Sequence, residues 1–403
     1  MTRQVKSPNG AVRRFGCRQR CYTNENLTIS GIILFARRVG MFKVRREKVV
    51  AMLELDPYKP LPNPGETALI EIRPSVAVIG GGLSGMIAAR LLAERGYPVT
   101  VFDKGRQPGG RGSIRVEDPY TFDHGCQYFT ARDRRFQRYV EAWIEQGIVS
   151  LWNARRASCL RGAVNLVHDD VTRYVGVPGM NAMVRHLASG MDVRSGLEIT
   201  DSRRVPGGWQ LTGTKPIPEL FDLLISSAPA PQTANVLRTT RLAEEAAKVN
   251  MLPCWTAMAV FDYDLELPFD AAHISASPLV WAANNGSKPG RSRHECWVMQ
   301  ASPSWSIEHI DDAPDAVAEA LLAAFFEAAG AAPVTPRFTR SHRWRYASPE
   351  EPLRAECLWD AEEWVGACGD WCHSARMEGA FISGLTLVER VLNDRPRAPE
   401  FCR

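Results

Sequence analysis

The feature that most constrains this 403-residue chain is the stretch SVAVIGGGLSGMIAARLLAERGYPVTVFDKG, which begins at Ser75. Its first five residues are apolar and rich in Val and Ile, which predicts a buried parallel strand. Gly80, Gly82 and Gly85 follow in the pattern G-x-G-x-x-G. The first glycine permits a tight turn, the second lets the backbone approach a pyrophosphate, and the third allows close packing of helix on strand.

The rest of the stretch completes a strand–turn–helix–strand unit. Met86–Arg95 has a helical pattern, Gly96 ends it, and Tyr97–Phe102 predicts a second strand. Asp103 closes that strand 18 residues beyond Gly85, near the spacing of about 20 at which an acidic residue binds a ribose diol. The helix N-terminus would turn its unpaired N–H groups toward the phosphates. The unit therefore predicts a dinucleotide-binding α/β domain.

Two further segments favour FAD over NAD as the dinucleotide. The sequence GGRG at Gly109–Gly112 is a second glycine-rich turn, and in large FAD-dependent oxidoreductases such a turn and its arginine lie along the pyrophosphate. Near the C-terminus, a predicted strand at Trp364–Ala367 is followed by Gly369, Asp370 and the sequence MEGAFISG, which opens a helix at Met377. The combined pattern resembles the amine-oxidase branch of FAD-dependent oxidoreductases.

Within that branch, the chain resembles the renalase family, in particular its bacterial members. The resemblance covers about Ser75 to Asn393, roughly four-fifths of the chain. Besides the three nucleotide segments, it rests on FDHGCQYFTARD (Phe122–Asp133), YVGVPGMNAMVRHLA (Tyr174–Ala188), WAANNGSKPGR (Trp281–Arg291), WVMQASPSWS (Trp297–Ser306) and HRWRYASP (His342–Pro349). The QYFTARD and SKPGR sequences are the most specific of these.

The renalase resemblance implies an oxidase that takes hydride from 2- or 6-dihydro isomers of NAD(P). The hydride goes to flavin N5, NAD(P)+ is released, and O2 takes the electrons to form hydrogen peroxide. Hydride transfer to a flavin depends on stacking and positioning more than on acid–base groups. Two alternatives stay open: an amine oxidase or desaturase of the same superfamily, and a protein that binds FAD without turnover.

The candidate site residues follow from these segments. By the resemblance, Asp370 binds a ribityl hydroxyl, the helix after Met377 points at the flavin pyrimidine edge, and the backbone of Leu197 meets the adenine. Cys126 is a candidate neighbour of the flavin, and we expect the FAD to be bound non-covalently. The candidate cofactor contacts are Gly80, Gly82, Ser84, Gly85, Asp103, Lys104, Gly110, Arg111, Cys126, Gln127, Leu197, Gly369, Asp370, Glu378, Gly379 and Ala380.

Candidate catalytic residues are less specific. Aromatic residues are frequent in the middle of the chain: Tyr128, Phe129, Trp255, Trp281, Trp297, Trp305, Trp344 and Tyr346. Each of them is also an ordinary core residue. Tyr128 and Trp281 are the aromatic candidates. His373 and Arg376, between Asp370 and the flavin helix, are the polar candidates at the flavin edge, with a capping or surface position as the alternative.

The expected fold is α/β with two domains. An FAD-binding Rossmann-like domain would use residues 75–127, 192–249 and 356–394, and a substrate domain with an antiparallel sheet plus helices would use residues 128–191 and 250–355, an architecture of the amine-oxidase type. The alternating runs CWTAMAVFDYD and ECWVMQA predict antiparallel strands. An Ala- and Leu-rich helix is predicted at Asp315–Ala329, ended by Gly330.

Residues 1–74 form a basic extension, and 395–403 a short tail. The first 50 residues hold 12 Lys and Arg against two acidic residues, a net charge of +10, so the remainder of the +4 chain is near −6. Such a segment is compatible with a transit peptide or a nucleic-acid arm. We expect instead a disordered tail or a start codon placed too far upstream, followed by the Pro-rich linker PYKPLPNP.

Other classes are disfavoured by what the sequence lacks. The apolar run ISGIILFA is too short to span a membrane, and the chain has no secretory cleavage pattern. The ten cysteines have neither zinc nor thioredoxin spacing, so we expect reduced thiols, no metal, and a cytoplasmic protein. The expected partners are a small dihydronicotinamide nucleotide and O2, with no nucleic acid and no membrane.

Overall fold

The computed structural model describes residues 73–394. The predictions for residues 1–72, most of the basic extension, and for the tail at 395–403 lie outside the described residues. The described residues open with the predicted unit: β1 (Val76–Ile79), α3 (Leu83–Ala93) and β2 (Val99–Asp103). The helix begins three residues earlier than the sequence predicts, directly after the glycine turn, and Gly96 follows it with φ +82°.

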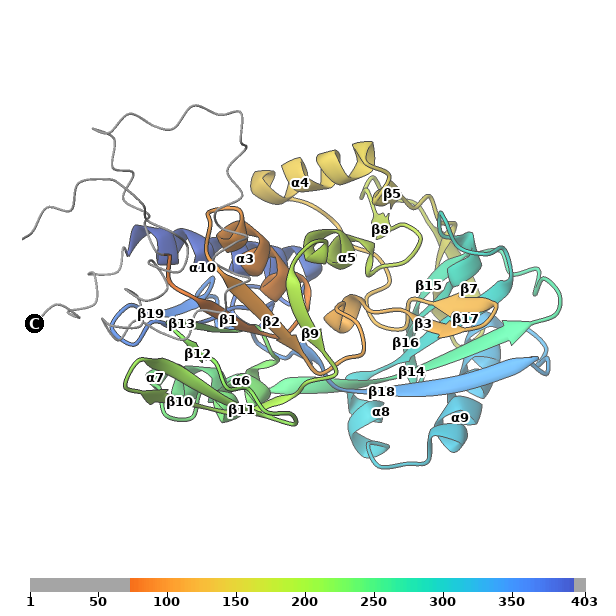
Figure 1. Ribbon diagram of the computed structural model, residues 1–403. Coiled ribbons are helices and arrows are strands. Elements are labelled where there is room, and N and C mark those ends of the chain that lie inside the picture. The colour runs from red at the N-terminus through yellow and green to blue at the C-terminus, as the bar shows by residue number, and fades with distance from the viewer. Residues whose placement is uncertain (1–72, 395–403) are drawn as a thin grey trace, which may run out of the picture. The chain divides into compact units, whose positions relative to one another are not determined.

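The central sheet brings together strands that lie far apart in the sequence (Figure 1). Its order is β19 (Leu358–Asp360), β20 (Val365–Ala367), β13 (Leu223–Ser226), β1, β2 and β9 (Asp192–Ser195). All neighbours are parallel except β19 and β20. Parallel strands need crossover connections, and the long excursions between these strands supply them.

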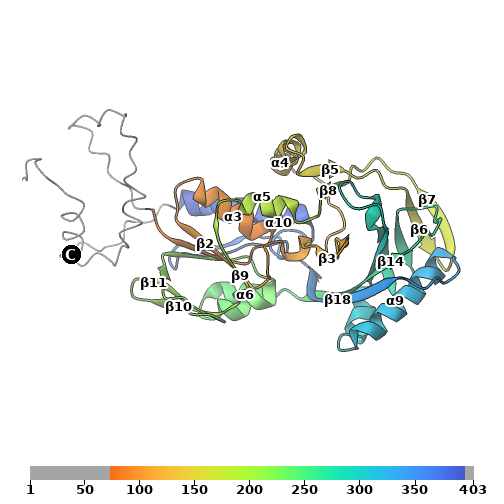
Figure 2. The same ribbon diagram turned by 45° about the vertical axis from the view of Figure 1, so that its right-hand side comes forward.

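The two faces of this sheet are covered differently, as the alternation of side chains along β1 requires. Val76 and Val78 pack against helices α3, α5 (Ala182–Ala188) and α10 (Met377–Asn393), whereas Ala77 and Ile79 pack with β11. Figure 2 shows these helices on one side and β10, β11 and α6 on the other. The elements of that second side are β10 (Ile199–Val205), β11 (Gly208–Gly213), β12 (Leu220–Phe221), α6 (Ala230–Val236) and α7 (Arg241–Ala247).

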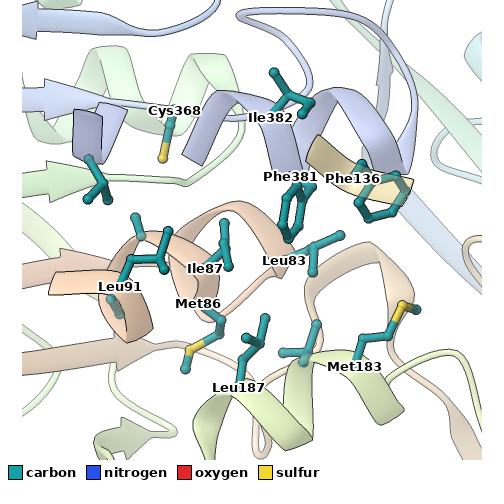
Figure 3. Close-up of a cluster of buried hydrophobic side chains, with 14 of the residues drawn as sticks. Leu83, Met86, Ile87, Leu91, Phe136, Met183, Leu187, Cys368, Phe381 and Ile382 are labelled. Atoms are coloured by element: carbon teal, nitrogen blue, oxygen red, sulfur yellow. The ribbon is translucent and has the colours of Figure 1, made fainter. Parts of the chain in front are cut away.

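The helical face is a continuous apolar cluster. Leu83, Met86, Ile87 and Leu91 of α3 meet Phe381 and Ile382 of α10, Met183 and Leu187 of α5, and Phe136 of α4 (Arg134–Glu145) (Figure 3). Gly384 allows α10 to approach α3 closely, because a Cβ there would collide with the carbonyl oxygen of Ser84. Tight packing of these two helices fixes the N-terminus of α3 beside the central sheet.

The other half of the described fold is built on a second sheet, which has seven strands. Its order is β18 (Phe338–Pro349), β14 (Met251–Phe261), β17 (Glu295–Ala301), β16 (Leu279–Asn284), β15 (Ala271–Ser275), β6 (Arg156–Leu160) and β7 (Ala163–Val167). The pairs are antiparallel, except β15 with β6. The predicted strands at residues 254–264 and 295–301 are thus paired neighbours.

Helices cover one face of the seven-stranded sheet. Ala257, Ala259 and Phe261 of β14 pack against α9 (Pro314–Ala329), which ends at Gly330 as predicted. Met258 and Val260 point to the opposite face, where the hairpin of β3 (Arg115–Glu117) and β4 (Tyr120–Phe122) packs. Smaller elements complete the fold: η1 (Gly110–Gly112), β5 (Val149–Leu151), β8 (Tyr174–Gly176), η2 (Asn285–Ser287) and α8 (Pro303–Glu308).

The α/β fold class predicted from the sequence is confirmed. The central sheet takes its strands from residues 75–127, 192–249 and 356–394, and the second sheet from residues 128–191 and 250–355. The described residues nevertheless belong to one compact unit. The division into an FAD-binding and a substrate domain therefore stays a proposal.

Candidate functional site

A cleft of about 2180 Å³ runs from the carboxyl ends of β1 and β2 to the face of β18. This is the position at which open parallel sheets bind ligands. The cleft is more than twice the upper end of the range of about 300–1,000 Å³ for ordinary small-molecule sites. Its size fits a dinucleotide together with a second ligand.

The first glycine turn leaves the N-terminus of α3 open toward the cleft. Gly82 is the N-cap, and neither a side-chain cap nor an acidic residue satisfies the first-turn N–H groups. The hydroxyl of Ser84 lies in this turn, is 5% exposed and has no hydrogen-bond partner among the described residues. Gly85 faces inward, where a Cβ would collide with the carbonyl oxygen of Gly80. An anionic ligand would satisfy these donors.

The second glycine turn lies directly against the first. Gly109 N–H donates to the carbonyl oxygen of Gly81 at 2.8 Å. Gly110 has φ +53°, and a Cβ on it would lie 3.0 Å from the Cα of Gly82. Only glycine fits both requirements without strain. The two turns thus form one backbone-lined cradle.

Asp103 closes one wall of the cradle. Its carboxylate accepts from Gly81 N–H at 2.5 Å and from Gly105 N–H at 2.6 Å, one bond on each oxygen. Burial raises the pKa of Asp103 above its ordinary value, although these two N–H groups oppose the rise. A carboxylate has about four acceptor positions. Two therefore remain for a ribose diol.

Arg111 and Asp370 form a bidentate ion pair across the cleft. The Nη2–Oδ1 distance is 2.6 Å and the Nη1–Oδ2 distance is 2.7 Å. Arg111 also donates to the carbonyl oxygen of Ala347 at 3.1 Å, and Asp370 Oδ1 accepts from Trp371 N–H at 2.9 Å. Asp370 is 7% exposed. One acceptor position on its Oδ2 is left for a hydroxyl, which suits a polyol chain.

Leu197 lies at the end of the cleft beyond Asp103. Its N–H donates to the carbonyl oxygen of Asp103 at 3.0 Å. The predicted backbone contact with adenine would therefore use the Leu197 carbonyl oxygen. Lys104, exposed beside Asp103, lines the same end.

The loop after β4 carries the wall opposite the cradle. Cys126 N–H donates to the carbonyl oxygen of Arg111 at 2.8 Å, so this loop meets the second glycine turn directly. Burial raises the pKa of the Cys126 thiol to about 11. A protonated thiol is a poor nucleophile, which accords with a non-covalent cofactor.

A buried ion cluster fixes this loop. Asp123 Oδ2 lies 3.1 Å from Lys288 Nζ and 2.6 Å from Arg291 Nη2, and the three side chains are at most 1% exposed. Lys288 also donates to Gln127 Oε1 at 3.1 Å. Although burial opposes ionisation, Lys288 and Arg291 hold the pKa of Asp123 below its ordinary value. Breaking such a buried cluster is strongly destabilising.

Three aromatic rings line the cleft beside the loop. The ring of His124 lies 4.8 Å from that of His342 and 4.9 Å from that of Trp344, and the last two are 4.5 Å apart. Trp344 Nε1 donates to the carbonyl oxygen of His124 at 3.0 Å. Burial, helped by neighbouring His342 and Arg115, lowers the pKa of His124 to about 3. Burial and Arg115 lower that of His342 to about 4, so both imidazoles are neutral at pH 7.

Most of the predicted cofactor residues come together around the cleft. The lining includes Gly80, Gly82, Ser84, Asp103, Lys104, Gly110, Arg111, Cys126, Leu197, Gly369, Asp370 and Ala380. Gly85 lies behind the lining, in the helix-packing position predicted for it. Gln127 also lies behind it, bound to Lys288.

Glu378 and Gly379 do not reach the cleft. Glu378 Oε1 accepts from the N–H groups of Arg132 and Asp133, at 2.5 and 2.7 Å, so its carboxylate orders the entrance to α4. Gly379 permits close packing, because a Cβ there would collide with Ser374. The polar contact expected from Glu378 is thus directed at a neighbouring loop.

Tyr128, Trp281 and His373 also lie outside the lining, whereas Arg376, the N-cap residue of α10, is part of it. The rings of Tyr128 and Trp281 are 5.4 Å apart, and Trp152 lies 6.1 Å from Tyr128. These rings pack deeper between the two halves of the chain, as part of the core. His373 Nδ1 lies 3.1 Å from Ser374 Oγ. A core or capping position was the alternative expected for Tyr128, Trp281 and His373, and these contacts are of that kind.

Sequence reasoning missed several residues that line the cleft, among them His124, His342 and Gln300. Gln300 donates to the carbonyl oxygen of Gly125 at 2.7 Å. Two signals were available: His124 stands inside the FDHGCQYF segment, and His342 and Trp344 alternate along β18. Their meeting depends on pairing across more than 200 residues, which no local pattern reveals.

These features fit FAD. The cradle offers unpaired donors and an unpartnered Ser84 hydroxyl to a pyrophosphate, and Asp103 and Asp370 have acceptor positions for hydroxyl groups. Among residues 73–394, no group of three or more His, Cys, Asp or Glu is placed to hold a metal ion. Within the same residues, no helix is both long and apolar enough to cross a membrane.

Comparisons with known proteins agree with this reading of the cradle. A protein-family model described as an NAD(P)-binding Rossmann-like domain matches residues 78–143. A 4,4'-diapophytoene desaturase (4,4'-diaponeurosporene-forming) of Staphylococcus haemolyticus (strain JCSC1435) is 38% identical over 76 residues, 16% of this chain and 15% of the desaturase. The same enzyme of Staphylococcus aureus (strain Newman) is 36% identical over 76 residues. The chain thus spans about 15% of the length of these curated relatives.

Solved structures extend the likeness over the whole described fold. Cyclohexylamine oxidase from Brevibacterium oxydans IH-35A aligns with a TM-score of 0.65 at 12% identity, covering 80% of this chain and 99% of that chain. The chain has the amine-oxidase fold. A protein provisionally named a protoporphyrinogen oxidase, from Exiguobacterium sp. 255-15, aligns with a TM-score of 0.67 at 13% identity over the same shares of the two chains. At such identities the likeness concerns the fold alone.

The cofactor predicted from the sequence, a non-covalent FAD, fits the geometry of the cradle. The comparisons show a Rossmann-like dinucleotide-binding unit and the amine-oxidase fold. The relatives and solved structures named above do not identify the electron donor. The donor, and with it the finer activity, is therefore a matter for proposal.

Proposed function

We propose that this protein is a renalase-like oxidase that converts 2- or 6-dihydro isomers of NAD(P) into NAD(P)+. The reaction consumes one dihydronicotinamide, one O2 and one proton, and yields one NAD(P)+ and one hydrogen peroxide. FAD, when bound, would supply the hydride acceptor and the route of the two electrons to O2. Everything else in the reaction is positioning, which is the task of the chain's own residues.

The observation that carries this proposal is the contact between the two most renalase-like segments. Asn285, in the WAANNGSKPGR segment, donates to the Thr121 carbonyl oxygen at 2.7 Å and accepts from Asp123 N–H at 3.2 Å. Lys288 and Arg291 of the same segment hold the Asp123 carboxylate. The two segments resemble the family separately in the sequence, yet together they fix the loop that presents His124 and Cys126 to the cleft.

The lining residues suit a planar, uncharged ring better than an amine. The rings of His124, His342 and Trp344 offer a stacking surface, and the imidazoles are neutral at pH 7 because burial lowers their pKa values. Gln300 holds the loop that carries this surface in place through Gly125. A donor ring stacked here would exclude water and be held in one orientation, as hydride transfer requires.

The alternative, an amine oxidase or desaturase, draws on the activities named for the relatives. The desaturase match is confined to 76 residues, about the size of the dinucleotide-binding unit that many unrelated activities share. The amine oxidases share the fold at 12% identity. At that identity the likeness concerns the backbone fold, and it does not show that the side chains at the β18 end of the cleft are shared.

Anaerobic stopped-flow absorbance of the flavin band tests the proposal. We expect 2- or 6-dihydronicotinamide nucleotides to reduce the flavin at least about 100-fold faster than 4-dihydro NADH, a gap of roughly 2.7 kcal/mol. A misplacement of about 1 Å is enough for a loss of that size. Under air, peroxide should appear in step with NAD(P)+.

Two variants sharpen the experiment. Trp344→Ala should slow reduction by the isomers about tenfold or more, because a stacking surface is lost. Trp305→Ala is the matched control, since that ring stacks on His309 outside the cleft and should leave the rate unchanged. Equal rates for isomers and ordinary NADH, or fast reduction by amines alone, would contradict the proposal and leave FAD binding standing. No reduction by either donor would favour a non-catalytic FAD protein.

A further inference from the structure

The β18 end of the cleft is rich in arginine. Arg115, Arg340, Arg343 and Arg345 all line it. Two carboxylates face them: Glu117, which pairs with Arg115 and Arg340, and Asp311, which pairs with Arg343 and Arg345. Four positive and two negative charges leave this end with a net charge of +2.

The pair around Glu117 has an unusual geometry. Arg115 Nε lies 2.9 Å and Arg340 Nη1 lies 3.1 Å from the same oxygen, Glu117 Oε1. The side chains of Arg115, Glu117 and Arg340 are 27%, 23% and 46% exposed. One shared oxygen cannot saturate two guanidinium groups, each of which has five N–H donors. Donors therefore remain for an anion from the cleft.

The same pair borders the aromatic rings. Arg340, His342 and Trp344 alternate along β18 and so project from one face. His342 pairs with Thr256 and Arg340 with Met258 in the register of β14, which sets the arginine two residues from the imidazole on that face. Arg115 is close enough to lower the pKa of both His124 and His342. A cationic pair thus adjoins a stacking surface.

The second pair is oriented differently. Arg343 and Arg345 belong to the opposite set of alternating β18 side chains. The guanidinium of Arg343 lies 5.5 Å from the Trp255 ring and donates to the Ile310 carbonyl oxygen. Their carboxylate, Asp311, is 82% exposed. This pair is at the rim, away from the face that carries His342 and Trp344.

We propose that Arg115 and Arg340 form an anion subsite that binds a phosphate of the substrate, so that the cleft selects phosphorylated ring donors over amines. The inference rests on the proposed function in taking the aromatic surface as the seat of the donor ring. Guanidinium groups bind phosphate by paired, charge-assisted hydrogen bonds. An alkylammonium donor would meet the same positive charges as a repulsion.

Calorimetric titration of the FAD-loaded protein with inorganic pyrophosphate tests the subsite directly. Because the cofactor fills the glycine cradle, the probe reports on the β18 end. Arg340→Ala should weaken pyrophosphate binding about tenfold or more, through the lost charge-assisted bonds. Glu117→Gln should strengthen it about fivefold, because a competing negative charge is removed. Arg337→Ala is the matched control: Arg337 pairs with Asp262, is 63% exposed and is not part of the lining.

A weaker pyrophosphate affinity in Arg340→Ala and a stronger one in Glu117→Gln, with no change in Arg337→Ala, would support the subsite. Equal affinity in all four proteins, or no measurable binding to the wild type, would overturn it. A second comparison uses nicotinamide mononucleotide and nicotinamide riboside, which differ by one phosphate. A preference for the mononucleotide of about tenfold that disappears in Arg340→Ala supports the subsite, and a preference that persists contradicts it.

The experiments distinguish a failure of the anion subsite from a failure of the renalase-like activity. Pyrophosphate binding that depends on Arg340, in a protein whose flavin no dihydronicotinamide reduces, would retain the anion subsite and remove the renalase-like activity. Rapid reduction by the isomers, with pyrophosphate affinity unaffected by Arg340→Ala, would do the reverse. The calorimetric readout needs no turnover, so it does not depend on the identity of the donor.

Discussion

His124 should make the folded protein sensitive to mild acid. Its side chain is 5% exposed, its Nδ1 has no partner among the described residues, and burial lowers its pKa from 6.5 to about 3. The native state therefore holds a neutral imidazole, while the unfolded chain takes up a proton as the pH falls through 6.5. The stability that His124 contributes is full above pH 6.5 and is lost progressively between about pH 6.5 and 3.

The size of the loss follows from the two pKa values. At pH 5 the unfolded imidazole is 1.5 units below its pKa of 6.5, and the native one stays unprotonated. At 1.36 kcal/mol per unit, the free energy of unfolding should fall by about 2 kcal/mol between pH 7 and pH 5 through this residue alone. Carboxylates also titrate in this range, so a single protein cannot isolate the effect.

The comparison of variants isolates it. Urea unfolding at pH 7 and pH 5, at saturating FAD, should show that His124→Gln loses about 2 kcal/mol less than the wild type between the two pH values. The starting stability of the variant does not matter, because each protein is compared with itself. His168→Gln, at an exposed position, is the control and should follow the wild type. A loss in His124→Gln as large as in the wild type would refute the assignment of a buried neutral imidazole.

Two other predictions concern the cofactor. Acid precipitation of the purified yellow protein should release the colour into the supernatant, because the thiol of Cys126 is protonated at neutral pH; colour that stays in the pellet would indicate a covalent link. Asp370→Ala should weaken FAD retention by about 1.5–3 kcal/mol, since a charge-assisted bond to the ribityl chain is lost and Arg111 loses its partner. Dialysis followed by flavin fluorescence measures it, and near-normal retention would remove Asp370 from the site.

Local signals predicted the fold well. The glycine pattern with its flanking strands placed β1, α3 and β2 correctly, because turn chemistry and apolar periodicity act within a few residues. The start of the C-terminal helix at Met377 was also predicted correctly. The predicted start of α3, at Met86, was three residues later than its start in the structure, because Leu83 and Ser84 were assigned to the turn. A helix whose N-cap is glycine has no side-chain signal to mark its first residue.

The wall of the cleft was harder to predict. Alternation along residues 338–349 indicates a strand, but the sequence does not say which face meets the cleft. Tyr128 and Trp281 were chosen as aromatic residues in resembling segments, and they pack with each other in the core. His124 was passed over, although it stands two residues from Cys126. Its position depends on Trp344, 220 residues away, and on the neighbouring Asp123, whose partners Lys288 and Arg291 are 165 and 168 residues away from it.

The clamp between Arg111 and Asp370 also has a consequence for synthesis of the protein. Its two residues are 259 positions apart, so at about 5–20 residues per second the ribosome needs roughly 13–52 s to join them. The first glycine turn and its helix emerge long before the strand and helix that brace them. A nascent chain must therefore wait with an unbraced dinucleotide cradle. A message truncated before the codon for Asp370 would yield a protein with both glycine turns of the cradle and no clamp to retain the flavin.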